Sequence, residues 1–75
     1  MKKLELEKLF IKDNVPKNLY SLNGGLPNEV LCLNKRDNIL EVYYSERGLK
    51  SNLKKFDTED DACEYFYKTV LELLN

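Results

Sequence analysis

Four carboxylates lie close together in the sequence near the end of the chain. They are the only cluster of acidic residues whose spacing could support metal binding or acid–base catalysis. They are Glu59, Asp60, Asp61 and Glu64. Clustered carboxylates can hold a hard cation such as Mg²⁺. The competing interpretation is structural, because acids in the first turn of a helix complement its unpaired amides and its dipole. Thr58 precedes the cluster with the spacing of a capping box, so we favour the structural interpretation and expect no metal site.

The remaining candidates for catalysis are few. The chain has no histidine, the most frequent general acid or base and a common metal ligand. Its two cysteines, Cys32 and Cys63, form no C-x-x-C pair and cannot complete a usual zinc site within one chain. We expect two reduced, inert core thiols. A disulfide would require Cα atoms within about 7 Å, which the sequence does not show. We therefore expect no catalytic residue, no cofactor and no enzyme activity.

A basic stretch from Arg47 to Lys55 carries four positive charges and no acid. Together with an exposed aromatic such as Tyr43, it has the pieces of a small nucleic-acid-binding module, which combines phosphate contacts with base stacking. The alternative is a solvated edge, since lysine beside a short strand also discourages edge-to-edge pairing.

Apolar periodicity predicts the elements that must position these residues. Apolar side chains recur at helical spacing near both ends of the chain, and β-rich runs flank the polar turn 35–38 in the middle. We expect a helix over about 3–12, a loop over 13–28, strands over about 29–34, 39–46 and 53–56, and a helix over about 58–74. This order predicts an α+β fold, a two-layer sandwich with the N-terminal and the C-terminal helix packed on one face of a three-stranded antiparallel sheet.

Two local features refine this architecture. In the strand 39–46, alternation places Leu40, Val42 and Tyr44 on the core face and leaves Glu41, Tyr43, Ser45 and Arg47 on an open face. In the loop, Gly24-Gly25 lacks the context of either glycine-rich phosphate motif, so we expect a turn with positive φ rather than a phosphate cradle. Regular structure in that loop is limited to a short extended piece near Tyr20.

Composition sets broader limits. Seventy-five residues with 43% hydrophobic and 33% charged side chains are typical of one soluble globular domain. A net charge of −1 argues against nucleic-acid binding through a general positive field. The chain shows neither the apolar run of a signal peptide, about 7 to 15 residues, nor that of a membrane span, roughly 20 residues. We expect a cytoplasmic monomer.

Two stretches resemble a pattern found in small immunity proteins of bacterial polymorphic toxin and contact-dependent inhibition systems. The first and more specific is Tyr43-Tyr44-Ser45-Glu46-Arg47-Gly48, and the second runs from Phe56 to Phe66. The resemblance covers roughly residues 15–70. It implies a cytoplasmic antitoxin that binds the toxic domain of a cognate effector and blocks it without turnover, and it carries over no catalytic or contact residues.

The sequence itself suggests two surfaces for such a partner. The last eighteen residues carry a net charge of −4, from five acids against Lys68. If the toxin is a nuclease with a basic cleft, the outer face of the last helix is its natural complement. The open sheet face is the competing surface, since tyrosine and arginine are favoured at interfaces. The candidate partner-binding residues are Asp60, Asp61, Glu64, Glu41, Tyr43 and Arg47. No membrane and no small-molecule substrate is expected.

Overall fold

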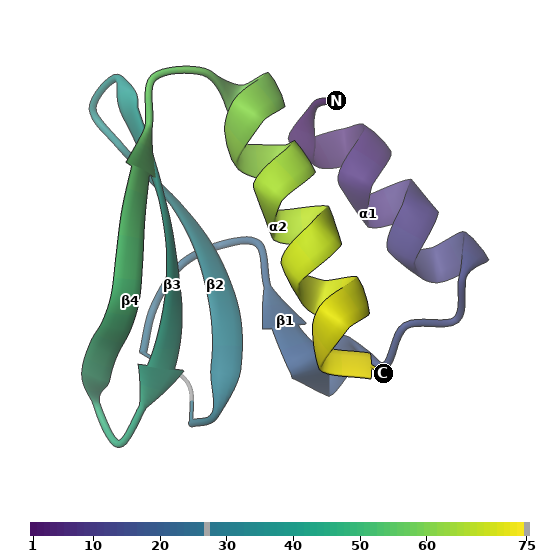
Figure 1. Cartoon of the computed structure of the whole chain (residues 1–75), viewed down its shortest axis with the longest axis horizontal. Helices are drawn as coiled ribbons and strands as arrows, with labels where there is room; N and C mark the ends of the chain where they lie inside the picture. The colour runs from purple at the N-terminus through teal and green to yellow at the C-terminus, as the bar shows by residue number, and fades with distance from the viewer. Residues whose placement is uncertain (27, 75) are drawn as a thin grey trace.

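The computed structural model describes residues 1–26 and 28–74. Two helices, one 3₁₀ turn and a mixed four-stranded sheet make up the domain (Figure 1). Their order is α1 (Lys3–Lys12), η1 (Lys17–Leu19), β1 (Tyr20–Ser21), β2 (Val30–Arg36), β3 (Ile39–Glu46), β4 (Leu49–Phe56) and α2 (Glu59–Leu74). The α+β class, both helices and strand β3 agree with the sequence-based expectation.

The sheet has one more strand than expected. Its order is β1-β2-β3-β4, and β1 pairs parallel with β2 through Tyr20 opposite Leu31 and Ser21 opposite Cys32. The other two pairs are antiparallel. The prediction of a three-stranded, purely antiparallel sheet was therefore wrong in this detail. A two-residue strand is too short to show an alternation of its own, and only its partner defines it.

Both helices cover the same face of the sheet, and α1 lies on the outer side of α2 (Figure 1). The core between them holds Leu6 and Phe10 from α1 with Phe66 from α2, all fully buried. The rings of Phe10 and Phe66 lie 6.0 Å apart, centroid to centroid. From the sheet, Leu40 and Val42 are buried against this layer and Tyr44 is half-buried, so the predicted core face is confirmed.

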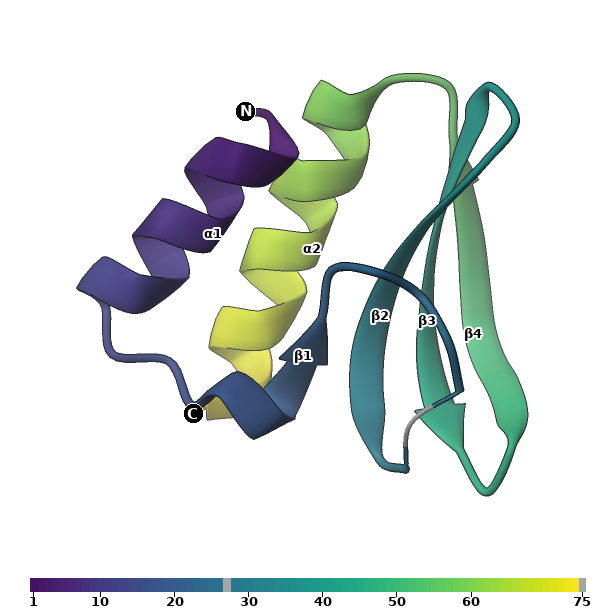
Figure 2. The same ribbon diagram turned by 180° about the vertical axis from the view of Figure 1, so that it is seen from behind.

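The connection from β1 to β2 crosses the opposite face of the sheet (Figure 2). Three contacts fix this loop. The Gly24 N–H donates to the Leu33 carbonyl at 2.9 Å, the Tyr43 hydroxyl donates to the Gly25 carbonyl at 2.7 Å, and the Arg47 N–H donates to Asn28 Oδ1 at 3.2 Å. The central strands are consequently covered on both sides.

Strand β4 begins earlier than expected. A loop was expected through Leu49–Asn52, but Arg47 and Gly48 close a two-residue hairpin turn with φ of 53° and 78°, and pairing resumes with Leu49 opposite Glu46. Farther along, the register shifts between Val42 and Tyr44. There Asn52, at φ 53°, forms a β-bulge, which bends a strand and increases its twist.

Within the described residues, no helix has both the length and the apolar character needed to cross a membrane.

Candidate functional site

The acidic cluster stands at the first turn of α2, where it joins the starts of the two helices. Thr58 Oγ1 accepts a hydrogen bond from the Asp61 N–H at 3.2 Å, which is the capping contact that the sequence suggested. Glu59 Oε2 accepts from the Lys3 N–H at 2.6 Å, at the beginning of α1. Asp60 Oδ1 accepts from the Met1 amino group at 2.7 Å. Two of the four acids thus stabilise the packing of α1 against α2.

The Met1 amino group and the Asp60 carboxylate at this junction shift each other's pKa. The hydrogen bond from the Met1 amino group is the largest cause that lowers the pKa of Asp60, and nearby Lys2 lowers it further. The same bond raises the pKa of the amino group. Asp61 and Glu64 are exposed, and Glu64 is close enough to add to the raised pKa of the amino group. Across residues 1–26 and 28–74, no three acidic or thiol side chains come close enough together to bind a metal ion.

The two thiols lie on opposite sides of the sheet. Cys63 belongs to the core between the sheet and the helices, whereas Cys32 packs with Val30 and Tyr43 on the other face. Both are free and fully buried. Burial is the main reason why the pKa of each thiol is raised above its ordinary value. The expectation of two free, buried core thiols is confirmed, and the possibility of a disulfide between them is removed.

The sheet face that carries Tyr43 is not open, so the expectation of an exposed surface there was wrong. Only 1% of Tyr43, 4% of Glu41 and none of Ser45 is accessible to solvent. One cause is the β1–β2 loop, in which the Gly25 carbonyl accepts a hydrogen bond from the Tyr43 hydroxyl. Another is Lys50, whose Nζ lies 4.6 Å from the centre of the Tyr43 ring and 3.8 Å from Glu41. Tyr43 and Glu41 therefore cannot contact a partner while this loop is in place.

Glycine allows the loop to approach so closely. Gly24 and Gly25 have φ of 72° and 86°, so the predicted positive-φ turn is confirmed. A Cβ at Gly24 would lie 2.5 Å from Asn34 Oδ1. Asn34 in turn donates through Nδ2 to Glu41 Oε1 at 3.4 Å. The buried carboxylate of Glu41 is further balanced by Lys50, whose Nζ lies 3.8 Å away.

Arg47 remains accessible at the tip of the β3–β4 hairpin. A structural role for Arg47 would be to pair with a nearby acid and so fix the bend at Gly48. In the part of the chain that the structure describes, no carboxylate lies within salt-bridge distance of its guanidinium. The bend is fixed instead by the backbone, through the bond from the Arg47 N–H to Asn28 Oδ1.

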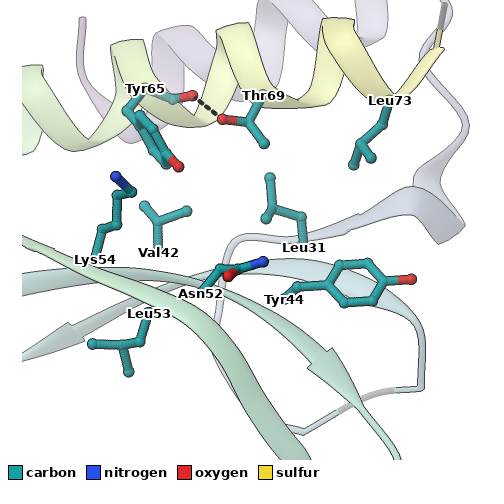
Figure 3. A pocket seen from close by; sticks show the side chains of 9 residues that line it. All are labelled: Leu31, Val42, Tyr44, Asn52, Leu53, Lys54, Tyr65, Thr69 and Leu73. Carbon is teal, nitrogen blue, oxygen red and sulfur yellow. Dashed lines mark hydrogen bonds between the residues drawn. The ribbon is translucent and has the colours of Figure 1, made fainter.

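An open groove of about 430 Å³ lies between α2 and the β3–β4 side of the sheet, and the sequence analysis did not identify it. Both layers contribute to its lining (Figure 3), and the Leu53 side chain points away from α2. The lining residues are Leu31, Val42, Tyr44, Asn52, Leu53, Lys54, Tyr65, Thr69 and Leu73. We call this feature the α2–β4 groove. The α2 side of the groove is formed by Tyr65, Thr69 and Leu73.

The groove has an apolar floor and one basic wall. Leu31 and Val42 are almost fully buried at its base. Tyr65 packs on Phe56 at a ring-centroid distance of 5.4 Å, and Lys54 Nζ lies 5.5 Å from the centre of the Tyr65 ring. The Thr69 hydroxyl is committed to the Tyr65 carbonyl at 2.7 Å. Such a mainly apolar lining suits the binding of side chains rather than acid–base chemistry.

The outer rim of the groove is strand β4, and seven of its eight residues are exposed. Leu49 and Leu53 are 72% and 38% exposed. In the described residues β4 pairs with β3 alone, so its other edge is free. The basic stretch that the sequence analysis singled out is thus an edge strand and the turn before it.

Comparison of the chain with models of known protein families, with curated proteins and with solved structures finds no match.

Proposed function

We propose that the protein is an immunity protein, a cytoplasmic inhibitor that neutralises a bacterial toxin domain by direct non-covalent binding. The α2–β4 groove is the observation that carries the binding role. It places an apolar hollow of about 430 Å³ beside an exposed strand, whereas the acids and thiols that could have done chemistry are either exposed singly, buried or used in helix packing. The choice of a toxin as partner rests on the sequence resemblance.

The chain has enough surface for such a complex on one face. A stable interface buries about 800 Å² on each partner, which is roughly one sixth of the 5139 Å² surface of this chain. One face therefore suffices. Between the surfaces suggested by the sequence, the covered sheet face is closed to a partner, and Asp60 is already used by the Met1 amino group.

Asp61 and Glu64 keep the acidic face as a competitor within this proposal. If the toxin is a nuclease with a basic cleft, these two exposed carboxylates speed its association. Replacing both with lysine would then slow binding far more at low salt than at high salt, because salt screens exposed charges. Equal association rates in both salts would exclude this role.

Growth protection tests the proposed function. If a toxic domain is encoded directly upstream of this gene, it is induced in a host cell with and without the protein, and growth is measured. We expect growth to be restored and the two proteins to co-purify as a complex. Unrestored growth, with both proteins present in the soluble fraction, would contradict the proposal. Mass spectrometry of proteins co-purified from the native host identifies a partner if no toxin gene lies upstream.

A second function, binding of nucleic acid, is favoured by one observation. The four cations from Arg47 to Lys55 lie along one hairpin edge. Against it, the ring of Tyr43 that would stack on a base is buried. Fluorescence anisotropy with a labelled single-stranded oligonucleotide separates the two functions, since binding through phosphates weakens steeply as salt rises.

A further inference from the structure

Within the described residues, β4 is the longer of the two edge strands of the sheet, with eight residues against two in β1. The strand spans eight residues, from Leu49 to Phe56, and β3 covers one of its edges only. The N–H and C=O groups on the other edge form a template for one more strand. Lysines and bulges commonly protect such edges from pairing with other strands. β4 has both, namely Lys50, Lys54 and Lys55 and the bulge at Asn52. The edge is thus protected against indiscriminate pairing.

The charge of this edge argues against a second copy of the chain as the occupant. Residues 47–55 contain four cations and no acid. Two copies of β4 side by side would bring lysine next to lysine, and like charges on facing strands repel. A strand rich in Asp and Glu would instead gain an attraction at each position.

The two sides of β4 differ in chemistry, which specifies the occupant further. Lys54 faces the groove, opposite Val42, and Figure 3 shows it directed toward Tyr65. Lys55 and Lys50 are paired with Glu41 and Ser45 and therefore lie on the other side. Lys50 lies 3.8 Å from Glu41 and is 36% exposed. Lys55 forms no ion pair in the described part of the chain.

We propose that β4 binds an extended segment of the toxin domain, which becomes a fifth strand of the sheet. In this bound segment, apolar and acidic side chains alternate. This proposal rests on the proposed function and adds the mode of binding. Side chains on one side of the added strand enter the α2–β4 groove beside Tyr44, Tyr65 and Leu73. Side chains on the other side place carboxylates against Lys50 and Lys55. Main-chain bonds supply the affinity and the alternating side chains supply the specificity, as in other cases of strand addition.

A peptide titration tests this mode without any toxin. The probe is a blocked peptide of alternating Val and Glu with about the length of β4, and its matched control carries Lys in place of Glu. Amide shifts of the ¹⁵N-labelled protein report where each one binds. We expect saturable shifts in Leu49–Phe56 and at Thr69 and Leu73, and at least about tenfold weaker binding of the lysine peptide, because charge pairs change from attraction to repulsion.

Matched charge reversals then test the contacts. Lys50→Glu combined with Lys55→Glu is expected to weaken binding of the acidic peptide about tenfold. The control, Lys8→Glu combined with Lys12→Glu, reverses two exposed charges on α1 and is expected to leave binding within about twofold. The amide spectrum of each variant shows whether it is folded.

Several results would overturn the proposal. One is the absence of saturable shifts, and another is shifts centred on Asp61 and Glu64. Broadening of β4 signals with rising protein concentration alone would assign the edge to a second copy. Oligodeoxythymidine that shifts the same amides at lower concentration than the peptide would assign it to nucleic acid. Growth protection by the wild type that persists undiminished in the Lys50→Glu, Lys55→Glu variant would refute the strand addition and leave the immunity function standing.

Discussion

Strands β3 and β4 are neighbours of equal length in one sheet, but their environments are opposite. Both span eight residues. β3 has five buried residues, whereas β4 has none. The difference arises because β3 lies between the helices on one side and the β1–β2 loop on the other (Figure 2). On β4, only Phe56 is partly buried, where it packs on Tyr65 of α2. The centre of the sheet therefore supplies stability, and its edge stays available for the proposed binding.

The largest test of this contrast uses the same substitution in the two environments. Leu33 on β2 is 2% exposed and Leu49 on β4 is 72% exposed. Leu33→Ala is expected to lower the free energy of unfolding by about 2–5 kcal/mol, since it removes buried apolar surface and leaves a cavity. Leu49→Ala is expected to change it by less than about 0.5 kcal/mol. Urea unfolding followed by circular dichroism measures both, and comparable losses would contradict the division into centre and edge.

Two glycines extend the comparison to the loop and the hairpin tip. Gly24 and Gly48 both have positive φ, but a Cβ at Gly24 meets Asn34 while a Cβ at Gly48 meets open space. Gly48→Ala is expected to cost about 1 kcal/mol from backbone strain alone. Gly24→Ala adds displacement of Asn34 and is expected to cost about 2–3 kcal/mol. Thermal unfolding of the two variants measures the difference, and equal losses would show that the loop does not press on the sheet.

A smaller effect is expected from the hydroxyl that holds the loop. Tyr43→Phe removes the 2.7 Å bond to the Gly25 carbonyl and is expected to cost about 1 kcal/mol. Hydrogen exchange of the loop amides from Asn23 to Leu26 should accelerate. Tyr44→Phe is the matched control, because the Tyr44 hydroxyl donates no hydrogen bond within the described residues. If hydrogen exchange of the loop amides is unchanged in Tyr43→Phe, contacts other than this hydrogen bond keep the β1–β2 loop on the sheet.

The smallest effect concerns pH. Burial raises the pKa of the Cys32 and Cys63 thiols above the ordinary value of 9.0. The unfolded chain therefore releases these protons first as the pH rises, so stability that is fully present below about pH 8 falls above pH 9. Alkylation by iodoacetamide at pH 8 is expected to be slow in buffer and fast in urea. Rapid alkylation of the folded protein would contradict the buried positions of both thiols.

These contrasts also separate what the sequence predicts from what it does not. Helices α1 and α2 were predicted because their apolar spacing repeats over several turns, and β3 because Leu40, Val42 and Tyr44 alternate. The start of β4 was misplaced because a loop was expected after Gly48, whereas Arg47 and Gly48 form a two-residue turn and pairing resumes at Leu49. The alternation of apolar and polar residues indicates where a strand lies. It does not indicate where the strand begins, because a tight turn and a longer loop can contain the same residue types.

The candidate surfaces depended on contacts distant in the sequence. Glu41, Tyr43 and Ser45 have the polar character of an open face, but they are buried. The loop that returns to the Tyr43 hydroxyl and the Lys50 side chain, which lies beside Tyr43 and Glu41, both contribute to this cover. The α2–β4 groove depends on how α2 packs on the sheet, which no spacing within α2 or β4 records. By contrast, the capping role of Thr58 is local, and the sequence identified it correctly.

Hydrogen exchange of the complex between the protein and its toxin domain tests the central claim most directly. We expect the amides of β4, from Leu49 to Phe56, to exchange at least about tenfold more slowly in the complex, because an added strand occupies the free edge. The amides of Cys32 and Tyr43, already inside the sheet, should change little. Protection confined to the start of α2 around Asp61 and Glu64, with exchange in β4 unchanged, would contradict the account. It would place the partner on the acidic face of α2.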